Sequence, residues 1–209
     1  MNLHAVPDTP IEPLAIAAER GLHPDTITDA GIYQVTDDTI YKDWWAIPYP
    51  HRQGIWKTRY RNPSPQGKPK YKDEPGAQFH LYNPLRLGPG EEEVWFCEGE
   101  FDTLALCELG LKAIGIHGVD NVGSDEEKSR FRREWKLLFQ DSLNIVMFDN
   151  DTSGLESGRR LAGFLNGVVF DEWDTQYSDI NDWFRGDWQG LVDAIGGFRG
   201  RVRAVRGLV

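Results

Sequence analysis

The chain reads VWFCEGEFD from Val94 to Asp102 and NIVMFDND from Asn144 to Asp151. In each segment a short apolar run leads directly into carboxylates and a turn. Such runs, separated by helical patterns, are typical of βαβ units that build a parallel sheet. The carboxyl ends of parallel strands form the edge at which an open α/β sheet binds its ligands. We therefore expect Glu98, Asp149 and Asp151 to meet at one edge of the sheet.

The pattern around these segments alternates between strand and helix. It predicts strands at 94–98, 113–117, 144–148 and 167–170, and helices at about 101–109, 124–139 and 154–165. After residue 170 we expect a short acidic turn, two small helices near 180–195, and a charged tail that contains Arg199, Arg201, Arg203 and Arg206. The fold class is α/β, a Rossmann-type parallel sheet flanked by helices.

The first part of the chain has a different pattern. Residues 10–31 read as two short helices, and the alternation from Ile32 to about Pro63 predicts a small antiparallel sheet, followed by a polar loop over 63–76. This gives a small α+β lobe ahead of the parallel sheet. We place three domains, a basic N-terminal lobe at 1–92, the parallel-sheet domain at 93–185, and a short helix with a basic tail at 186–209.

Composition excludes some classes of protein. No apolar run approaches the roughly 18 residues needed to span a bilayer, and the first 13 residues lack the basic start and apolar core of a signal peptide. Cys97 and Cys107 have no CxxC spacing and no neighbouring histidines, so we expect no zinc site. A cytoplasmic protein with reduced thiols fits this usage.

The net charge of −10 is unevenly distributed. Residues 1–90 carry ten basic and ten acidic side chains, so the excess acid lies in residues 91–209. Between Trp44 and Lys72 there is no acid, while aromatic residues alternate with seven cations: Arg52, Lys57, Arg59, Arg61, Lys68, Lys70 and Lys72. Seven cations without an acid need an anionic partner or open solvent, and we expect them to bind nucleic acid or nucleotide. The tryptophans among them are expected to lie mostly in the core.

Two further acids belong with the strand-end carboxylates. Asp102 follows Glu98 by four residues, and Asp179 lies in a third acidic turn. Clustered carboxylates repel one another unless they are protonated or hold a cation, and oxygen ligands suit Mg²⁺ or Mn²⁺. We expect Glu98, Asp149, Asp151 and Asp179 to bind the metal. Asp102 could instead cap the following helix, and Glu91–Glu93, Glu100 and Glu126 are expected on solvated faces.

These motifs resemble the Toprim domain, the metal-binding module shared by DnaG-type primases, topoisomerases and some nucleases. Its glutamate after the first strand corresponds to EGEFD from Glu98 to Asp102, and its DxD corresponds to Asp149–Asp151, with Gly154 behind it. The segment Tyr177–Trp183 resembles a third primase motif, in which Ser178 stands at the family's lysine. The N-terminal lobe resembles the basic lobe of the same primases, where Lys70 matches a family cation.

The resemblance implies a DNA primase catalytic core of the minimal kind found in bacteriophages, working in the cytoplasm of a bacterial host. Such an enzyme makes short primers from nucleoside triphosphates on single-stranded DNA, with Glu98, Asp102, Asp149 and Asp151 as its catalytic residues. A separate zinc-binding or helicase subunit would supply what a minimal core lacks. Two alternatives remain open at this point, a metal-dependent Toprim nuclease and a non-catalytic subunit that binds nucleic acid.

Overall fold

The computed structural model describes residues 13–37, 39–51, 54–67, 69–118 and 135–207. Contacts divide the chain into two compact units, Met1–Gln78 and Phe79–Val209. The second unit therefore begins ahead of residue 93, where the sequence pattern places the parallel-sheet domain. Residues 79–92 pack into it, since Tyr82 bridges Gly115 and the ring of Phe79 lies 4.9 Å from that of His117.

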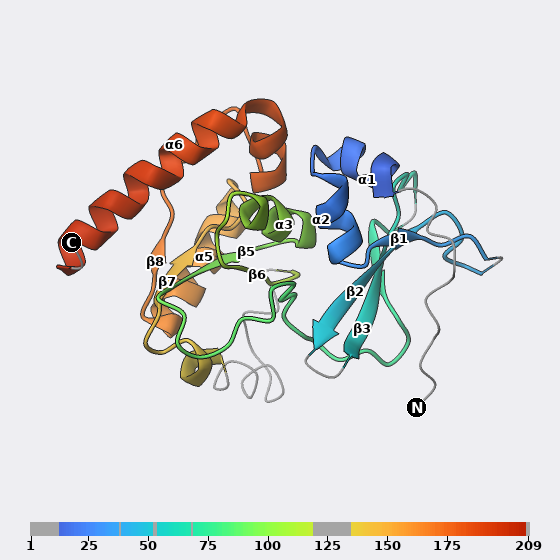
Figure 1. Ribbon diagram of the computed structural model, residues 1–209, viewed down its shortest axis with the longest axis horizontal. Coiled ribbons are helices and arrows are strands. Elements are labelled where there is room, and N and C mark those ends of the chain that lie inside the picture. The colour runs from blue at the N-terminus through green and yellow to red at the C-terminus, as the bar shows by residue number, and fades with distance from the viewer. Residues whose placement is uncertain (1–12, 38, 52–53, 68, 119–134, 208–209) are drawn as a thin grey trace. The chain divides into compact units, whose positions relative to one another are not determined.

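The first unit contains two short helices and an antiparallel sheet, as the sequence predicts (Figure 1). The helices are α1 (Pro13–Arg20) and α2 (Pro24–Asp29). The four strands lie side by side in chain order: β1 (Tyr33–Gln34), β2 (Trp45–His51), β3 (Gly54–Arg61) and β4 (Tyr71–Asp73). Strand β4 falls within the segment expected as a loop, because Tyr71 pairs with Arg61 across the sheet.

The second unit is built around a parallel sheet with strand order β6-β5-β7-β8. Its elements are β5 (Glu93–Cys97), α3 (Glu100–Glu108), β6 (Ala113–Gly115), β7 (Leu143–Val146), α5 (Thr152–Leu165), β8 (Val168–Val169) and α6 (Ile180–Arg206). The α/β fold and the four parallel strands are confirmed. Of the helix expected at 124–139, residues 119–134 lie outside the described residues, and Trp135–Leu138 are helical.

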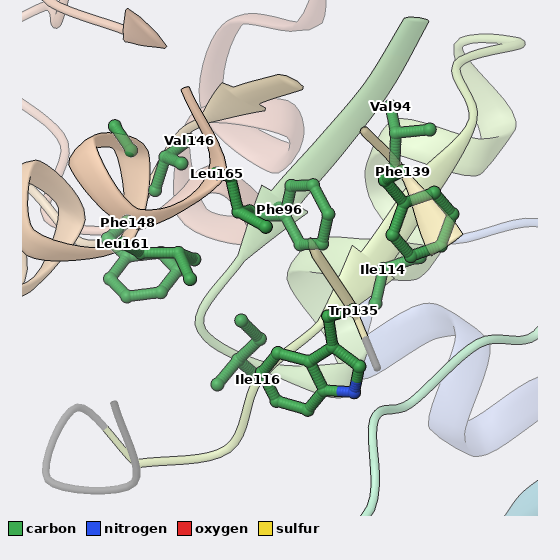
Figure 2. Packing of buried hydrophobic residues seen from close by; sticks show 11 residues of the cluster. Val94, Phe96, Ile114, Ile116, Trp135, Phe139, Val146, Phe148, Leu161 and Leu165 are labelled. Atoms are coloured by element: carbon green, nitrogen blue, oxygen red, sulfur yellow. The ribbon is translucent and has the colours of Figure 1, made fainter. Parts of the chain in front are cut away.

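Apolar side chains from both faces of this sheet form the core, because successive residues of a strand point to opposite faces. On one face Val94 and Phe96 of β5 pack in a cluster with Trp135, Phe139 and helix α5 (Figure 2). On the other face Trp95 lies within 6.3 Å of Phe198, measured between ring centroids. Because both faces of the sheet are covered by apolar side chains, polar side chains that belong to a site are accommodated at the ends of the strands.

Helix α6 extends much further than the sequence suggests. Asp187 breaks it with non-helical dihedral angles, and the second helical segment continues to Arg206 in place of the expected charged tail. The reason is tertiary: Arg199 and Arg203 both form ion pairs with the buried carboxylate of Glu93, which also accepts a hydrogen bond from Trp95 Nε1. These arginines are therefore engaged within the unit.

Within the described ranges, no helix is both long and apolar enough to cross a membrane. Both cysteines are free thiols; Cys97 is buried in β5, and Cys107 is partly buried in α3.

Candidate functional site

The predicted acids lie at the carboxyl ends of two neighbouring strands. Glu98 directly follows β5, Asp149 follows β7, and these strands pair side by side in the sheet. Asp102 lies in the first turn of α3. Asp151 and Asp179 are the N-terminal caps of α5 and α6.

Three of the aspartates use one oxygen to hold the backbone. Asp151 Oδ1 accepts a hydrogen bond from Gly154 N at 2.7 Å. Asp179 Oδ1 accepts one from Asp182 N at 2.7 Å, and Asp102 Oδ1 accepts one from Asn181 N at 2.9 Å. Such bonds satisfy N–H groups that a helix start leaves without a partner. They also fix the direction in which each carboxylate points.

The acids interact strongly with one another. The pKa of Asp149 is raised to about 9, first by burial and then, in decreasing order, by the negative charges of Asp102, Glu98, Asp179 and Asp151. The four other carboxylates therefore lie close enough to Asp149 for their charges to act on it.

Asp102 shows the same influence. Its pKa is raised to about 7, first by burial and then by the charge of Asp179, while the hydrogen bond from Asn181 N opposes the shift. Glu98 and Glu100 add smaller effects that raise the pKa. A carboxyl group with a pKa near neutrality can change its protonation state under ordinary conditions, as a proton-transfer group must.

Glu100 contradicts the expectation of a solvated face. Its side chain is only 1% exposed, and its charge acts on both Asp102 and Tyr82. One feature of the sequence could have placed Glu100 among the acids of the site. It lies in the first turn of α3, directly after Glu98 and Gly99. Glu93 was also expected in solvent and is buried, with Arg199 and Arg203 as partners.

Two glycines allow the acid-bearing loops to pack closely. A Cβ added to Gly99 would lie 2.6 Å from Asp102 Oδ2, and one added to Gly154 would lie 3.0 Å from the backbone N and C of Asp149 and closer still to its oxygen. The contact with Asp102 Oδ2 and the contact with the backbone oxygen of Asp149 are both too short for real atoms. Each glycine therefore leaves the space that a neighbouring aspartate occupies.

The donor set fits a hard divalent cation in its chemistry. When these carboxylates are ionised they repel one another, which is why the pKa values of Asp149 and Asp102 are raised, and a cation would relieve that repulsion. Across the part of the chain that the structure describes, no group of three or more His, Cys, Asp or Glu side chains is arranged to hold a metal ion. Metal binding by Glu98, Asp149, Asp151 and Asp179 therefore remains a prediction.

The basic stretch of the first unit divides into buried and exposed cations. Lys57 is 2% exposed, and its Nζ donates to Asp73 Oδ1 at 2.8 Å. Arg61 is 7% exposed and pairs with Glu19 at 3.4 Å. The inference that these seven cations need an external anion or open solvent is therefore wrong for Lys57 and Arg61, because their partners lie just outside the acid-free segment or far from it in sequence.

The other described cations lie nearer the surface, and two of them, Arg59 and Lys70, lie beside the ring of Tyr71. The guanidinium of Arg59 lies 4.1 Å and the ammonium of Lys70 5.7 Å from the ring centroid of Tyr71. Lys70 and Lys72 are exposed, and Arg59 is partly buried. Arg52 and Lys68 lie outside the described residues.

The tryptophans follow the expectation of a mostly structural role. Trp44 and Trp45 are buried, and the ring of Trp45 packs against the guanidinium of Arg61 at 4.6 Å. Trp56 on β3 is the exception, because it is 51% exposed.

Comparison with known proteins agrees with this architecture. A family model described as Toprim-like matches residues 95–184, so the second unit carries a Toprim-like domain. In an alignment of 133 positions, which covers 60% of this chain and 80% of the relative, the chain is 30% identical to the Gene 57 protein of Mycobacterium phage D29. The chain belongs to the same family as this phage protein, and the resemblance to a Toprim domain is confirmed.

Solved structures share the fold at low sequence identity. The crystal structure of the primase fragment of the bacteriophage T7 primase-helicase protein is 21% identical, with a TM-score of 0.65, and the match covers 85% of this chain and 72% of that chain. The Aquifex aeolicus primase, with its zinc-binding and RNA polymerase domains, is 17% identical with a TM-score of 0.57, and the match covers 88% of this chain and 48% of that chain.

Proposed function

We propose that this protein is a DNA primase, which joins nucleotides into short primers on a single-stranded DNA template. The observation that carries the proposal is the gathering of carboxylates around Asp149 and Asp102 at the strand ends of a Toprim-like sheet, where the charges of Glu98 and Asp179 act on both residues. The structures that share the fold include primases of a phage and of a bacterium. The Toprim-like family membership supports the same class of chemistry.

In primer synthesis a 3′-hydroxyl oxygen bonds to the α-phosphorus of a nucleoside triphosphate, and pyrophosphate leaves. Asp149, Asp151 and Asp179 would hold Mg²⁺ or Mn²⁺, which supplies positive charge opposite the reacting phosphate. Glu98 would hold an ion as well or accept the proton of the hydroxyl. Asp102 would orient Glu98 or a metal-bound water, since one of its carboxylate oxygens is fixed by Asn181 N.

The first unit would bind the template. The exposed Lys70 and Lys72 and the partly buried Arg59 suit phosphate contacts. The T7 fragment comes from a primase-helicase, and the Aquifex structure includes a zinc-binding domain. We therefore include a zinc-binding or helicase subunit among the proposed partners, along with the template and the nucleoside triphosphates.

The direct test is an assay for primer synthesis. The protein is incubated with single-stranded DNA, labelled ribonucleotides and Mg²⁺ or Mn²⁺, and in parallel with labelled DNA or RNA without nucleotides. We expect short products that fall by about 100-fold or more in Glu98→Gln and Asp149→Asn, the range over which a positioned acid or base acts. The matched control is Glu156→Gln, a change of the same kind on the exposed side of α5.

The outcomes distinguish the alternatives. Shortened labelled nucleic acid in the parallel reaction would instead support a nuclease. Binding of single strands without metal-dependent chemistry, even with a zinc-binding subunit added, would support a non-catalytic subunit.

Lys70→Ala should weaken binding of single-stranded DNA and flatten its dependence on salt. Each phosphate contact to a single strand contributes about 0.7 to the slope of log K against log salt. Fluorescence anisotropy between about 50 and 200 mM salt measures this slope. Lys112→Ala is the control, since this exposed lysine of the second unit pairs with Glu91. An unchanged slope in Lys70→Ala would remove Lys70 from the interface.

A further inference from the structure

The residue between the two aspartates, Asn150, makes two hydrogen bonds to the segment that leads into Asp179. Its backbone N–H donates to the carbonyl oxygen of Ser178 at 2.8 Å, and its side-chain Nδ2 donates to the carbonyl oxygen of Tyr177 at 3.0 Å. The loop after β7 and the loop before α6 are thereby joined at the level of the acids, although they are far apart in sequence.

The segment that accepts these hydrogen bonds, Tyr177–Ser178, is itself held in place by packing. The ring of Tyr177 stacks on Trp183 of α6, with centroids 5.8 Å apart and planes at 13°. A Cβ on Gly186 would lie 2.6 Å from a carbon of the same ring, so this turn of α6 packs directly on Tyr177. Asn150 thus binds to a firmly packed segment.

The connection works against electrostatic repulsion. Asp149 and Asp151 on one loop and Asp179 on the other bear the same charge when ionised, so these loops would move apart if charge alone decided their positions. A hydrogen bond to a backbone carbonyl adds attraction without adding charge. Asparagine can supply that bond, whereas an aspartate at 150 would lose the donor and increase the repulsion.

We propose that Asn150 is a positioning residue, which sets the separation of Asp149 and Asp151 from Asp179 and thereby the affinity for a divalent cation. This inference rests on the proposed function, because it assumes that these acids bind Mg²⁺ or Mn²⁺. Asn150 itself holds neither the ion nor the substrate. Outer partners of this kind typically change metal affinity by about 10- to 100-fold when they are removed.

The experiment measures Mn²⁺ binding to the whole protein by electron paramagnetic resonance, without any substrate. We expect Asn150→Ala and Asn150→Ser to raise the Kd for Mn²⁺ about tenfold, while circular dichroism shows a folded protein. In the primer assay, saturating Mn²⁺ should restore most of the activity of both variants. A purely structural role would lower the melting temperature without shifting the metal requirement.

Asn144→Ala is the matched control. Asn144 is a buried asparagine of the second unit, whereas Asn150 is partly buried, and the Nδ2 of Asn144 donates to the carbonyl oxygens of Phe139 and Leu165 at 3.0 and 3.1 Å, away from the acids. Its replacement should cost stability and leave the Kd for Mn²⁺ unchanged. An unchanged Kd in both Asn150 variants, beside weakened binding in Asp149→Asn, would overturn the role of Asn150 alone. A wild-type protein that binds no Mn²⁺ would overturn the metal site and this role with it.

Discussion

Gly154→Ala is expected to remove nearly all metal-dependent activity and to destabilise the second unit. The added methyl group would lie 3.0 Å from the backbone N and C of Asp149 and closer still to its carbonyl oxygen. Backbone atoms cannot rotate away as a side chain can, so the loop that carries Asp149 must move. Gly154 N also holds Asp151 Oδ1, and the second aspartate would be displaced with the first.

Gly154→Ala is expected to lower both the stability of the protein and its rate of primer synthesis. Overpacking of this kind costs about 1–3 kcal/mol of stability, and a displacement of about 1 Å in a catalytic group costs on the order of 100-fold in rate. Urea unfolding and the primer assay measure these effects, and Mn²⁺ binding reports the site without substrate.

Helix α5 provides its own control. A Cβ at Gly163 would meet no atom within 4 Å, so Gly163→Ala should leave activity intact. It should stabilise the protein by about 0.5–1 kcal/mol, because glycine is a poor helix former. Equal activity in Gly154→Ala and Gly163→Ala would show that the loop after β7 can relax and that its position is not critical.

The sheet and the place of its acids could be predicted from local sequence. Apolar runs such as Val94–Cys97 and Ile145–Phe148 are buried whatever helix covers them, and strand ends in a parallel sheet share one edge. Glu98, Asp149 and their neighbours are near one another for this reason alone. That part of the reasoning needs no knowledge of distant contacts.

The failures share a different cause, which is pairing between residues far apart in sequence. Arg61 is buried because Glu19 on α1 reaches it, and Arg199 is helical and paired because Glu93 begins β5. A local count of charge treats such residues as solvent-exposed. Only the packing of the elements reveals which cations remain available to bind nucleic acid.

Glu100 illustrates the same limit inside the candidate site. Its neighbours in sequence suggest a helix start with solvated acids, and the structure buries it beside Asp102 and Tyr82. Burying a further carboxylate among acids is unfavourable for the fold. Such a position is expected where charge serves a ligand and not stability.

Asp149→Asn is expected to stabilise the metal-free protein while it removes activity. The pKa of Asp149 is raised to about 9 and that of Asp102 to about 7, both above the usual value of 3.8. The folded protein therefore binds more protons than the unfolded chain between about pH 4 and about pH 9, and its stability falls as the pH rises through this range. Asparagine has no charge to lose, so the benefit of the substitution grows with pH.

We expect the free energy of unfolding to increase by on the order of 2 kcal/mol at pH 8. The upper limit is about 1.4 kcal/mol for each unit by which the pKa is raised. The gain stays below this limit because removing one acid also lets its neighbours ionise. This gain corresponds to a rise of about 4–8 °C in melting temperature at pH 8, and less at pH 5. Differential scanning calorimetry in the presence of a chelator measures both.

Divalent cations should reverse this ranking. Mg²⁺ binds the ionised acids, so it should stabilise the wild-type protein more at pH 8 than at pH 5. At pH 8 it should stabilise Asp149→Asn less than the wild type, because one of the acids is missing. Asp151→Asn is the control without metal, since asparagine also caps helices well and Asp151 is exposed. If Asp149→Asn melts below the wild type at pH 8 without metal, then repulsion among the acids does not strain the fold. The case that this strand edge is built to hold a cation would then lose its electrostatic basis.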